Sequence, residues 1–219
     1  MCVLRRYIPL KREAVNIAIG IRSDGGKEVL DFSVAPNENG EAWRELLESL
    51  RNRGIEQVQL FIADGFIGLE NVIAEIYPTA KFQRCLVHVL RNLTSHVRKS
   101  DMRDLMSELL EEAKQALDNF ILKWKSKYSN QMRKLGKLSN LFTFYEFPPS
   151  IRASIYSTNL IEAFNKKLKK KIRQKEQFPN EDALQRFVTT QILEYNDKFE
   201  ERAHRGFRGS KDTLDSMFI

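Results

Sequence analysis

The residue most clearly placed for chemistry is Asp64, which directly follows a short apolar run and precedes a glycine. The run, residues 58–62 with Ala63, lacks helical spacing and predicts a buried strand in a parallel arrangement. A carboxylate at the C-terminal end of such a strand lies where α/β sheets place ligand-binding groups. The alternative is an aspartate that caps a helix beginning near Phe66, and the motif alone favours neither interpretation.

Glu162 is the single acidic residue in a basic stretch, residues 160–175. Helical spacing puts it on one face with Asn165 or Lys166 and with Lys169. A carboxylate in line with lysines suits a metal-bound phosphodiester whose flanking phosphates need neutralising. We predict DNA contacts from Lys166, Lys169, Lys170 and Arg173. The competing interpretation is a solvated basic helix with an incidental glutamate, which the pattern by itself favours.

Cys85 and His88 have a Cys-x-x-His spacing that raises the question of zinc. A structural zinc site needs four ligands, and no second pair at ligand spacing exists among the remaining cysteines and histidines, Cys2, His96 and His204. We therefore expect no zinc. Cys85 and His88 are instead expected to pack near the end of the sheet, close to Asp64.

A mixed α/β sheet is the framework that the first part of the chain predicts for these residues. Apolar alternation over residues 14–21, a turn at 23–26 and a return strand at 29–34 predict a hairpin, with residues 2–4 as a neighbouring strand. A helix follows between an N-cap at Asn39 and a stop at Gly54, with Trp43 in its apolar stripe and in the core. A helix at 67–76 and a short strand at 81–83 complete the sheet.

The second part of the chain predicts helices alone. Residues 85 to about 145 show no strand pattern. Leu105, Leu109 and Ala113 share one helical face, as do Leu117, Ile121 and Trp124, and Pro148-Pro149 closes the block. Trp124 is a core residue or a base-stacking residue, with the core favoured.

Two more helices are expected before the C-terminal tail. One runs from Ser157-Thr158-Asn159, residues suited to an N-cap, to about Lys171. The other covers residues 181–199, after a break at 178–180. The tail after Ala203 is expected to be irregular.

The composition is that of an ordered, soluble, cytoplasmic protein. Hydrophobic residues make up 42% of the chain, and 36 basic against 29 acidic residues give a net charge of +7, which favours a polyanionic partner without requiring one. Two cysteines exclude a disulfide-rich secreted scaffold. The apolar runs are far shorter than the ~20 residues that span a bilayer. Charges near the N-terminus stand where a signal peptide would need its apolar core.

Three strings together resemble the Mutator family of bacterial insertion-sequence transposases. They are Asp64-Gly65, then Gln83-Arg84-Cys85-Leu86-Val87-His88, then Thr158-Asn159-Leu160-Ile161-Glu162-Ala163-Phe164-Asn165. The resemblance runs from about Tyr7 to the C-terminal tail. It is carried by the order and spacing of these strings.

The resemblance implies a fold and a division of the chain. The fold is an RNase H-like mixed sheet with an all-helical insertion before the last catalytic helix. Residues 1–84 would form the first part of the core, 85–155 the insertion, 156–203 the helices that complete the core, and 204–219 a basic tail.

The resemblance also implies a DDE active site. Two aspartates and a glutamate would hold two Mg²⁺ or Mn²⁺ ions for DNA cleavage and strand transfer, with Asp64 as the second acid and Glu162 as the third. Cys85, His88, Asn159 and Asn165 match motif positions without an assigned role, and Trp124 matches an insertion-domain tryptophan less securely. The implied partners are transposon-end and target DNA and further copies of the chain on DNA, in the nucleoid and without a membrane.

One position departs from the family pattern. Three residues before Tyr7, where the family keeps its first aspartate, the sequence has Leu4, and neither Asp24 nor Asp31 replaces it by register. Because Mg²⁺ can be held by one or two carboxylates with water and phosphate, Asp64 and Glu162 are expected to bind one ion weakly, and catalysis to be impaired. The N-terminal DNA-binding region of the family is not recognised either, so the chain resembles a truncated catalytic domain. The alternatives are a non-catalytic DNA-binding module that regulates a full-length transposase, or a relic.

Overall fold

The computed structural model describes residues 1–10, 13–35, 40–65, 68–95, 97–98, 100–101, 114–175 and 178–217. Within these residues, five strands form one sheet in the order β3-β2-β1-β4-β5. β1 (Cys2–Leu10), β2 (Glu13–Ile21) and β3 (Lys27–Ala35) pair antiparallel. β4 (Leu60–Ala63) pairs parallel with β1, and β5 (Lys81–Arg84) pairs parallel with β4. The predicted meander and the mixed α/β sheet are confirmed.

The first strand is longer than the sequence predicted. β1 was expected at residues 2–4, but it continues through Pro9 to Leu10. Its register with β2 shifts between Tyr7 and Leu10. Proline has no N–H to donate to a ladder, so pairing is irregular where it stands.

Helices cover both faces of the sheet. Successive side chains of a strand point to opposite faces, so Ile17 and Ala18 in β2 belong to two different apolar clusters. α1 (Gly40–Asn52) and α2 (Leu69–Ile76) pack on the face of Ala18, and the buried Trp43 confirms its predicted core position. Asn39 and Ile67, the predicted helix starts, lie outside the described residues, and Gly54 ends the first helix region with a φ of 94°.

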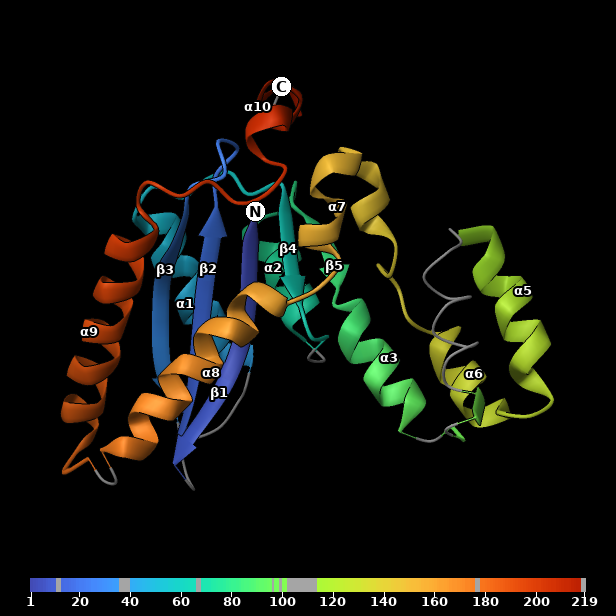
Figure 1. Cartoon of the computed structure of the whole chain (residues 1–219), viewed down its shortest axis with the longest axis horizontal. Coiled ribbons are helices and arrows are strands. Elements are labelled where there is room, and N and C mark those ends of the chain that lie inside the picture. Colours follow the sequence, from blue (N-terminus) through green and yellow to red (C-terminus); the bar gives the residue numbers. More distant parts are fainter. Residues whose placement is uncertain are drawn as a thin grey trace.

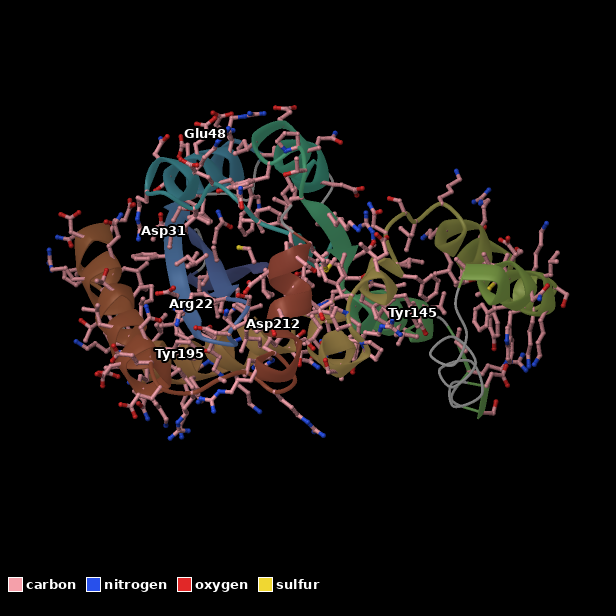
Figure 2. The ribbon with its side chains drawn as sticks, turned by 90° about the horizontal axis from the view of Figure 1, so that it is seen from above. Arg22, Asp31, Glu48, Tyr145, Tyr195 and Asp212 are labelled. Carbon is pink, nitrogen blue, oxygen red and sulfur yellow. The ribbon has the colours of Figure 1, made fainter. Side chains whose placement is uncertain are left out.

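The other face is covered by α8 (Asn159–Gln174), which crosses in front of β1 and β2 in Figure 1. α9 (Glu181–Phe199) begins where predicted, with Asn180 accepting a hydrogen bond from the Ala183 amide. Figure 2 shows the layers from above, with Glu48 of α1 and Tyr195 of α9 on opposite sides of the sheet.

α9 also protects the free edge of β3. Asn196 accepts a hydrogen bond from the Val29 amide at 2.8 Å and donates one to the Val29 carbonyl at 3.1 Å. Its side-chain amide thus pairs with the strand as a further strand would. An edge strand blocked in this way is less prone to pair with other chains.

The helical block contains α3 (Leu86–Thr94), α5 (Lys114–Lys125), α6 (Ser129–Leu135) and α7 (Pro149–Ile155). The expectation of helices alone from residue 85 to about 145 holds for α3, α5 and α6 but was wrong at its end, because residues 136–142 are irregular and Thr143–Glu146 is a short 3₁₀ turn. Pro148-Pro149 begins α7 instead of closing the block, since proline suits the first turn of a helix, where its missing N–H is not needed. Leu105, Leu109 and Ala113 lie outside the described residues.

The remaining helical prediction for this block is confirmed. Leu117, Ile121 and Trp124 are half-buried against the cluster under α8. Trp124 stacks on Tyr128, with ring centroids 6.1 Å apart, and also lies near Phe120. These contacts place Trp124 in the core of the helical block.

The tail is ordered, contrary to the expectation of an irregular segment. Arg208–Ser210 forms a 3₁₀ turn and Lys211–Ser216 forms α10. Phe207 and Leu214 are buried, and this apolar contact explains why the segment folds back on the domain. No helix in the described part of the chain combines the length and apolar character needed to cross a bilayer.

Candidate active site

Asp64 is the first exposed residue after the fully buried strand β4. Its side chain is 37% exposed. The N-cap position of α2 is Gly68, so Asp64 does not cap that helix. The carboxylate therefore stands at the C-terminal end of a parallel strand, where the sequence predicted it.

Arg84, at the end of β5, holds the loop that follows Asp64. Its guanidinium donates to the Gly65 carbonyl at 3.1 Å and to the Glu70 carboxylate at 3.1 Å. Glu70 also accepts hydrogen bonds from Ser139 and Asn140. Sequence reasoning quoted Arg84 only as part of a motif and did not identify this role, because Glu70 and residues 139–140 are distant from it in sequence.

The thiol of Cys85 is buried and surrounded by hydrogen-bonding groups. His88 Nδ1 lies 3.1 Å from Cys85 Sγ, and Thr158 donates to the sulfur from its amide at 3.2 Å and from its hydroxyl at 3.3 Å. Burial would raise the pKa of the thiol, but the hydrogen bonds from His88 and Thr158 outweigh burial and lower the pKa below its ordinary value. Thr158 was predicted as an N-cap; it occupies that position in α8 but makes no side-chain cap hydrogen bond, because its hydroxyl faces the sulfur.

His88 connects the two candidate acids. Its Nε2 lies 3.9 Å from Asp64 Oδ2 and 3.5 Å from Glu162 Oε1. Asp64, just after β4, and Glu162, on α8, therefore both approach the same ring nitrogen. This places both carboxylates well within the reach of one site, and it confirms that Cys85 and His88 pack close to Asp64.

Arg91, one turn after His88 on α3, adds a cation beside Glu162. Its guanidinium nitrogen lies 3.2 Å from Glu162 Oε1 and 3.4 Å from Oε2. The Glu162 side chain is 22% exposed, so this charge pair is only partly shielded from solvent. The sequence pattern did not point to Arg91, because its contact with Glu162 depends on how α3 and α8 pack.

Oxygen ligands for a hard cation can come from Asp64 and Glu162. Among the described residues, no group of three His, Cys, Asp or Glu side chains is arranged to hold a metal ion. One turn beyond Glu162, Asn165 is buried, and neither of its side-chain polar atoms has a hydrogen-bond partner. An unpartnered amide oxygen one turn from Glu162 is of the ligand type that Mg²⁺ prefers.

The basic residues of α8 lie on its exposed side. Its buried side consists of Ile161, Phe164, Asn165, Leu168 and Ile172. Lys166, Lys169, Lys170 and Arg173 are exposed, and of the two residues predicted to share a face with Glu162, Lys166 faces solvent whereas Asn165 turns inward. Asn159 is exposed at the start of the helix. The exposed cations leave a basic surface directly beyond Glu162.

The sequence of the chain is similar to one family of known proteins. The family described as "Transposase, Mutator family" matches residues 1–202. The chain is 48% identical to the transposase for insertion sequence element IS905 of Lactococcus lactis, over 97% of this chain and 58% of the relative. It is 46% identical to the transposase for insertion sequence element IS1201 of Lactobacillus helveticus, over 86% of this chain and 55% of the relative.

A more distant relative is the transposase for insertion sequence element IS256 in transposon Tn4001 of Staphylococcus aureus. It is 27% identical over 88% of this chain and 54% of its own length. The chain thus spans little more than half the length of these three relatives. Because the family match covers most of the sequence, the chain belongs to the Mutator family of transposases.

Proposed function

We propose that this chain is the catalytic domain of an insertion-sequence transposase, with Asp64 and Glu162 as two of the acids that act on DNA. The observation that carries the proposal is the approach of both carboxylates to His88 Nε2, at 3.9 and 3.5 Å, from elements far apart in sequence. The family supplies the class of reaction, which is DNA strand cleavage and transfer.

The sheet supports an RNase H-like assignment. β1 lies between β2 and β4, so the strand expected to carry the first acid neighbours the strand that ends at Asp64. Val3 pairs with Ile62, and the next residues of the two strands continue toward Leu4 and Asp64. The division into core, helical insertion and closing helices remains our proposal for this order of elements.

The acidic residues of this chain would bind metal, and its basic residues would bind and align the DNA. Asp64 and Glu162 would hold Mg²⁺ or Mn²⁺, which would stabilise negative charge on a scissile phosphate. Arg91 offsets the charge of Glu162, and His88 Nε2 lies within 4 Å of both carboxylates. Lys166, Lys169, Lys170 and Arg173 would neutralise neighbouring phosphates and so align the DNA along α8.

Leu4 limits what this site can do. An aliphatic side chain offers no ligand at the position of the first acid, so we propose weak metal binding and slow cleavage. This position also supports a second candidate function, a non-catalytic DNA-binding protein that competes with or regulates a full-length transposase. In that case the cations of α8 would be retained for binding while the chemistry is lost.

Nicking of supercoiled plasmid with Mg²⁺ or Mn²⁺ separates the two candidates. The native chain is compared with Asp64→Asn and Glu162→Gln, and binding is followed in parallel by gel shift. Slow metal-dependent nicking that both substitutions remove supports the transposase proposal. Nicking that both variants retain would contradict the site, and DNA binding without any nicking would support the second candidate.

A further inference from the structure

A pocket of about 380 Å³ lies beside Asp64 and is lined by residues of α3, of α6 and of the loop after α6. α3 lies between α8 and α6 in Figure 1 and contacts α6. Its residues His88 and Arg91 face Glu162, whereas Val89, Asn92 and Leu93 line the pocket. Asp64 therefore belongs to two adjoining spaces, the carboxylate site and this pocket.

The pocket has apolar walls and a polar rim. Val89 and Leu93 from α3, with Leu135 and Leu138 from α6 and its following loop, supply the walls. Val89, Leu93 and Leu135 are buried, so these walls are fixed by the packing of the core. The polar lining, which we call the rim, consists of the side-chain amides of Asn92 and Gln131, the cations of Lys134 and Arg84, and the Asp64 carboxylate. The Arg84 guanidinium already donates to Gly65 and Glu70.

Apolar walls with carboxamides beside them suit a planar heteroaromatic group that carries hydrogen-bonding atoms on its edge. Leucine and valine side chains offer surfaces against which an aromatic ring can pack, but they offer no hydrogen bonds to an anion. Carboxamides can donate to and accept from the edge of a base, as they do in direct base recognition. The volume lies within the range of small-ligand pockets, roughly 300–1,000 Å³, so a single nucleobase fits.

We propose that this pocket receives one unpaired nucleobase of the DNA, rotated out of the helix next to the phosphate at Asp64. The proposal rests on the proposed function for the position of that phosphate. A base is joined to its phosphate through one sugar, so a phosphate at Asp64 brings the flanking base to the rim of the pocket. Removing a base from the stack costs free energy, and enzymes recover it in a pocket of this kind.

The test uses two short DNA duplexes that carry equal charge. Each contains one 2-aminopurine, paired with thymine in the first duplex and opposite an abasic site in the second. We expect the full chain to bind the second duplex about tenfold more tightly, because the cost of unpairing has been removed. We also expect a change in 2-aminopurine fluorescence on binding. Affinities are measured with Mg²⁺ and again with EDTA.

A pocket-filling substitution provides the matched comparison. Leu138→Trp places an indole in the half-buried wall position and should abolish the tenfold preference, so that both duplexes bind equally. Leu122→Trp, at a leucine that is 68% exposed on α5, should keep the preference. If Leu138→Trp fails to fold, Gln131→Leu serves instead; it keeps the size of the side chain, removes a rim amide and should weaken the preference several-fold.

Three results would overturn the inference. The native chain could bind both duplexes equally, a folded Leu138→Trp could retain the preference, or Leu138→Trp could instead abolish self-association, which would assign the pocket to a second copy of the chain. These results leave the proposed function standing if Asp64-dependent nicking is observed. Conversely, a tenfold preference without nicking would support the pocket and contradict catalysis.

Discussion

Sγ of Cys85 lies 3.1 Å from Nδ1 of His88, the histidine whose other nitrogen faces Asp64 and Glu162. The buried thiol thus sets the orientation of the ring that the acids share. The same contact lowers the pKa of the Cys85 thiol and so makes the free energy of unfolding depend on pH. Comparing the native chain with Cys85→Ala isolates this contribution.

The pKa of Cys85 is lowered in the folded protein from an ordinary value of 9.0. The folded state therefore loses the thiol proton at lower pH than the unfolded state does. The stability that Cys85 contributes is complete above pH 9 and is lost as the pH falls through its lowered pKa. Urea titrations of the native chain and Cys85→Ala should diverge as the pH rises toward 9. A constant difference between the two would contradict the lowered pKa.

Cys2 provides a control with the opposite sign. Burial raises the pKa of Cys2 from 9.0 to about 12, so above pH 9 the unfolded thiol ionises while the folded one does not. This residue therefore costs stability as the pH rises. In the same titrations, Cys2→Ala should gain stability relative to the native chain above pH 9, whatever the fixed cost of its cavity. Parallel curves for the two proteins would refute this assignment.

Gly65 and Gly54 form a matched pair for testing how the loop after Asp64 is held. Both have positive φ, 87° and 94°, but a Cβ on Gly65 would lie within 1.9 Å of the Arg84 guanidinium, whereas a Cβ on Gly54 meets nothing within 4 Å. We expect Gly54→Ala to cost about 1–2 kcal/mol from backbone strain alone. Gly65→Ala should cost more in thermal unfolding and should also remove nicking. Equal costs, with nicking intact in both, would show that Arg84 does not position the loop.

The buried Asn165 side chain is expected to lower the stability of the fold and to contribute to metal binding. Its buried amide has no hydrogen-bond partner, a situation that costs about 1–3 kcal/mol. Asn165→Leu is expected to raise the free energy of unfolding by about 1 kcal/mol and to reduce the stabilisation that Mn²⁺ gives the native chain. Calorimetry with and without Mn²⁺ measures both effects. The exposed Asn159 on the same helix is the control, and Asn159→Leu should not change the Mn²⁺ effect; if Asn165→Leu leaves it unchanged too, Asn165 has no part in the site.

The lysines of α8 can be tested by salt dependence. If Lys166, Lys169 and Lys170 contact phosphates, their joint replacement by glutamine should flatten the log–log plot of affinity against salt by about two to three units. Replacing Lys123, Lys125 and Lys127, which lie on or just after α5, should leave that slope nearly unchanged. An unaltered slope in the α8 variant would make these lysines a solvated surface.

Leu4→Asp should recover part of the cleavage that we propose is lost. The new carboxylate would complete three acids, whose mutual repulsion favours a bound cation. Plasmid nicking with Mn²⁺ is the measurement. Leu4→Asn is the control, because asparagine has the shape of aspartate without its charge. Equal rates for both variants would show that position 4 does not contribute a ligand.

The sequence by itself determined the family and the order of the strands and of α1, α2, α8 and α9. Alternation in residues 14–21, the stripe around Trp43 and the apolar run before Asp64 are local patterns that depend only on the period of each element. For the same reason the basic character of α8 and its single acid could be predicted without a structure. Boundaries were less certain: Pro148-Pro149 fits both the end of one helix and the start of the next, and the tail folds only because Phe207 and Leu214 find an apolar surface elsewhere.

The tertiary structure alone decided which residues meet at the site. Whether Asn165 or Lys166 would face outward depended on the side of α8 that packs on the sheet. The Thr158 hydroxyl does not cap α8, because it donates to the sulfur of Cys85 instead. No local sequence pattern encodes this contact between residues 85 and 158. Arg84 acts on the loop after Asp64, and Arg91 on Glu162, through packing of distant segments. These contacts form only in the folded chain. They depend on the burial of apolar side chains of α3, α6 and α8 in one core cluster, which brings segments distant in sequence together.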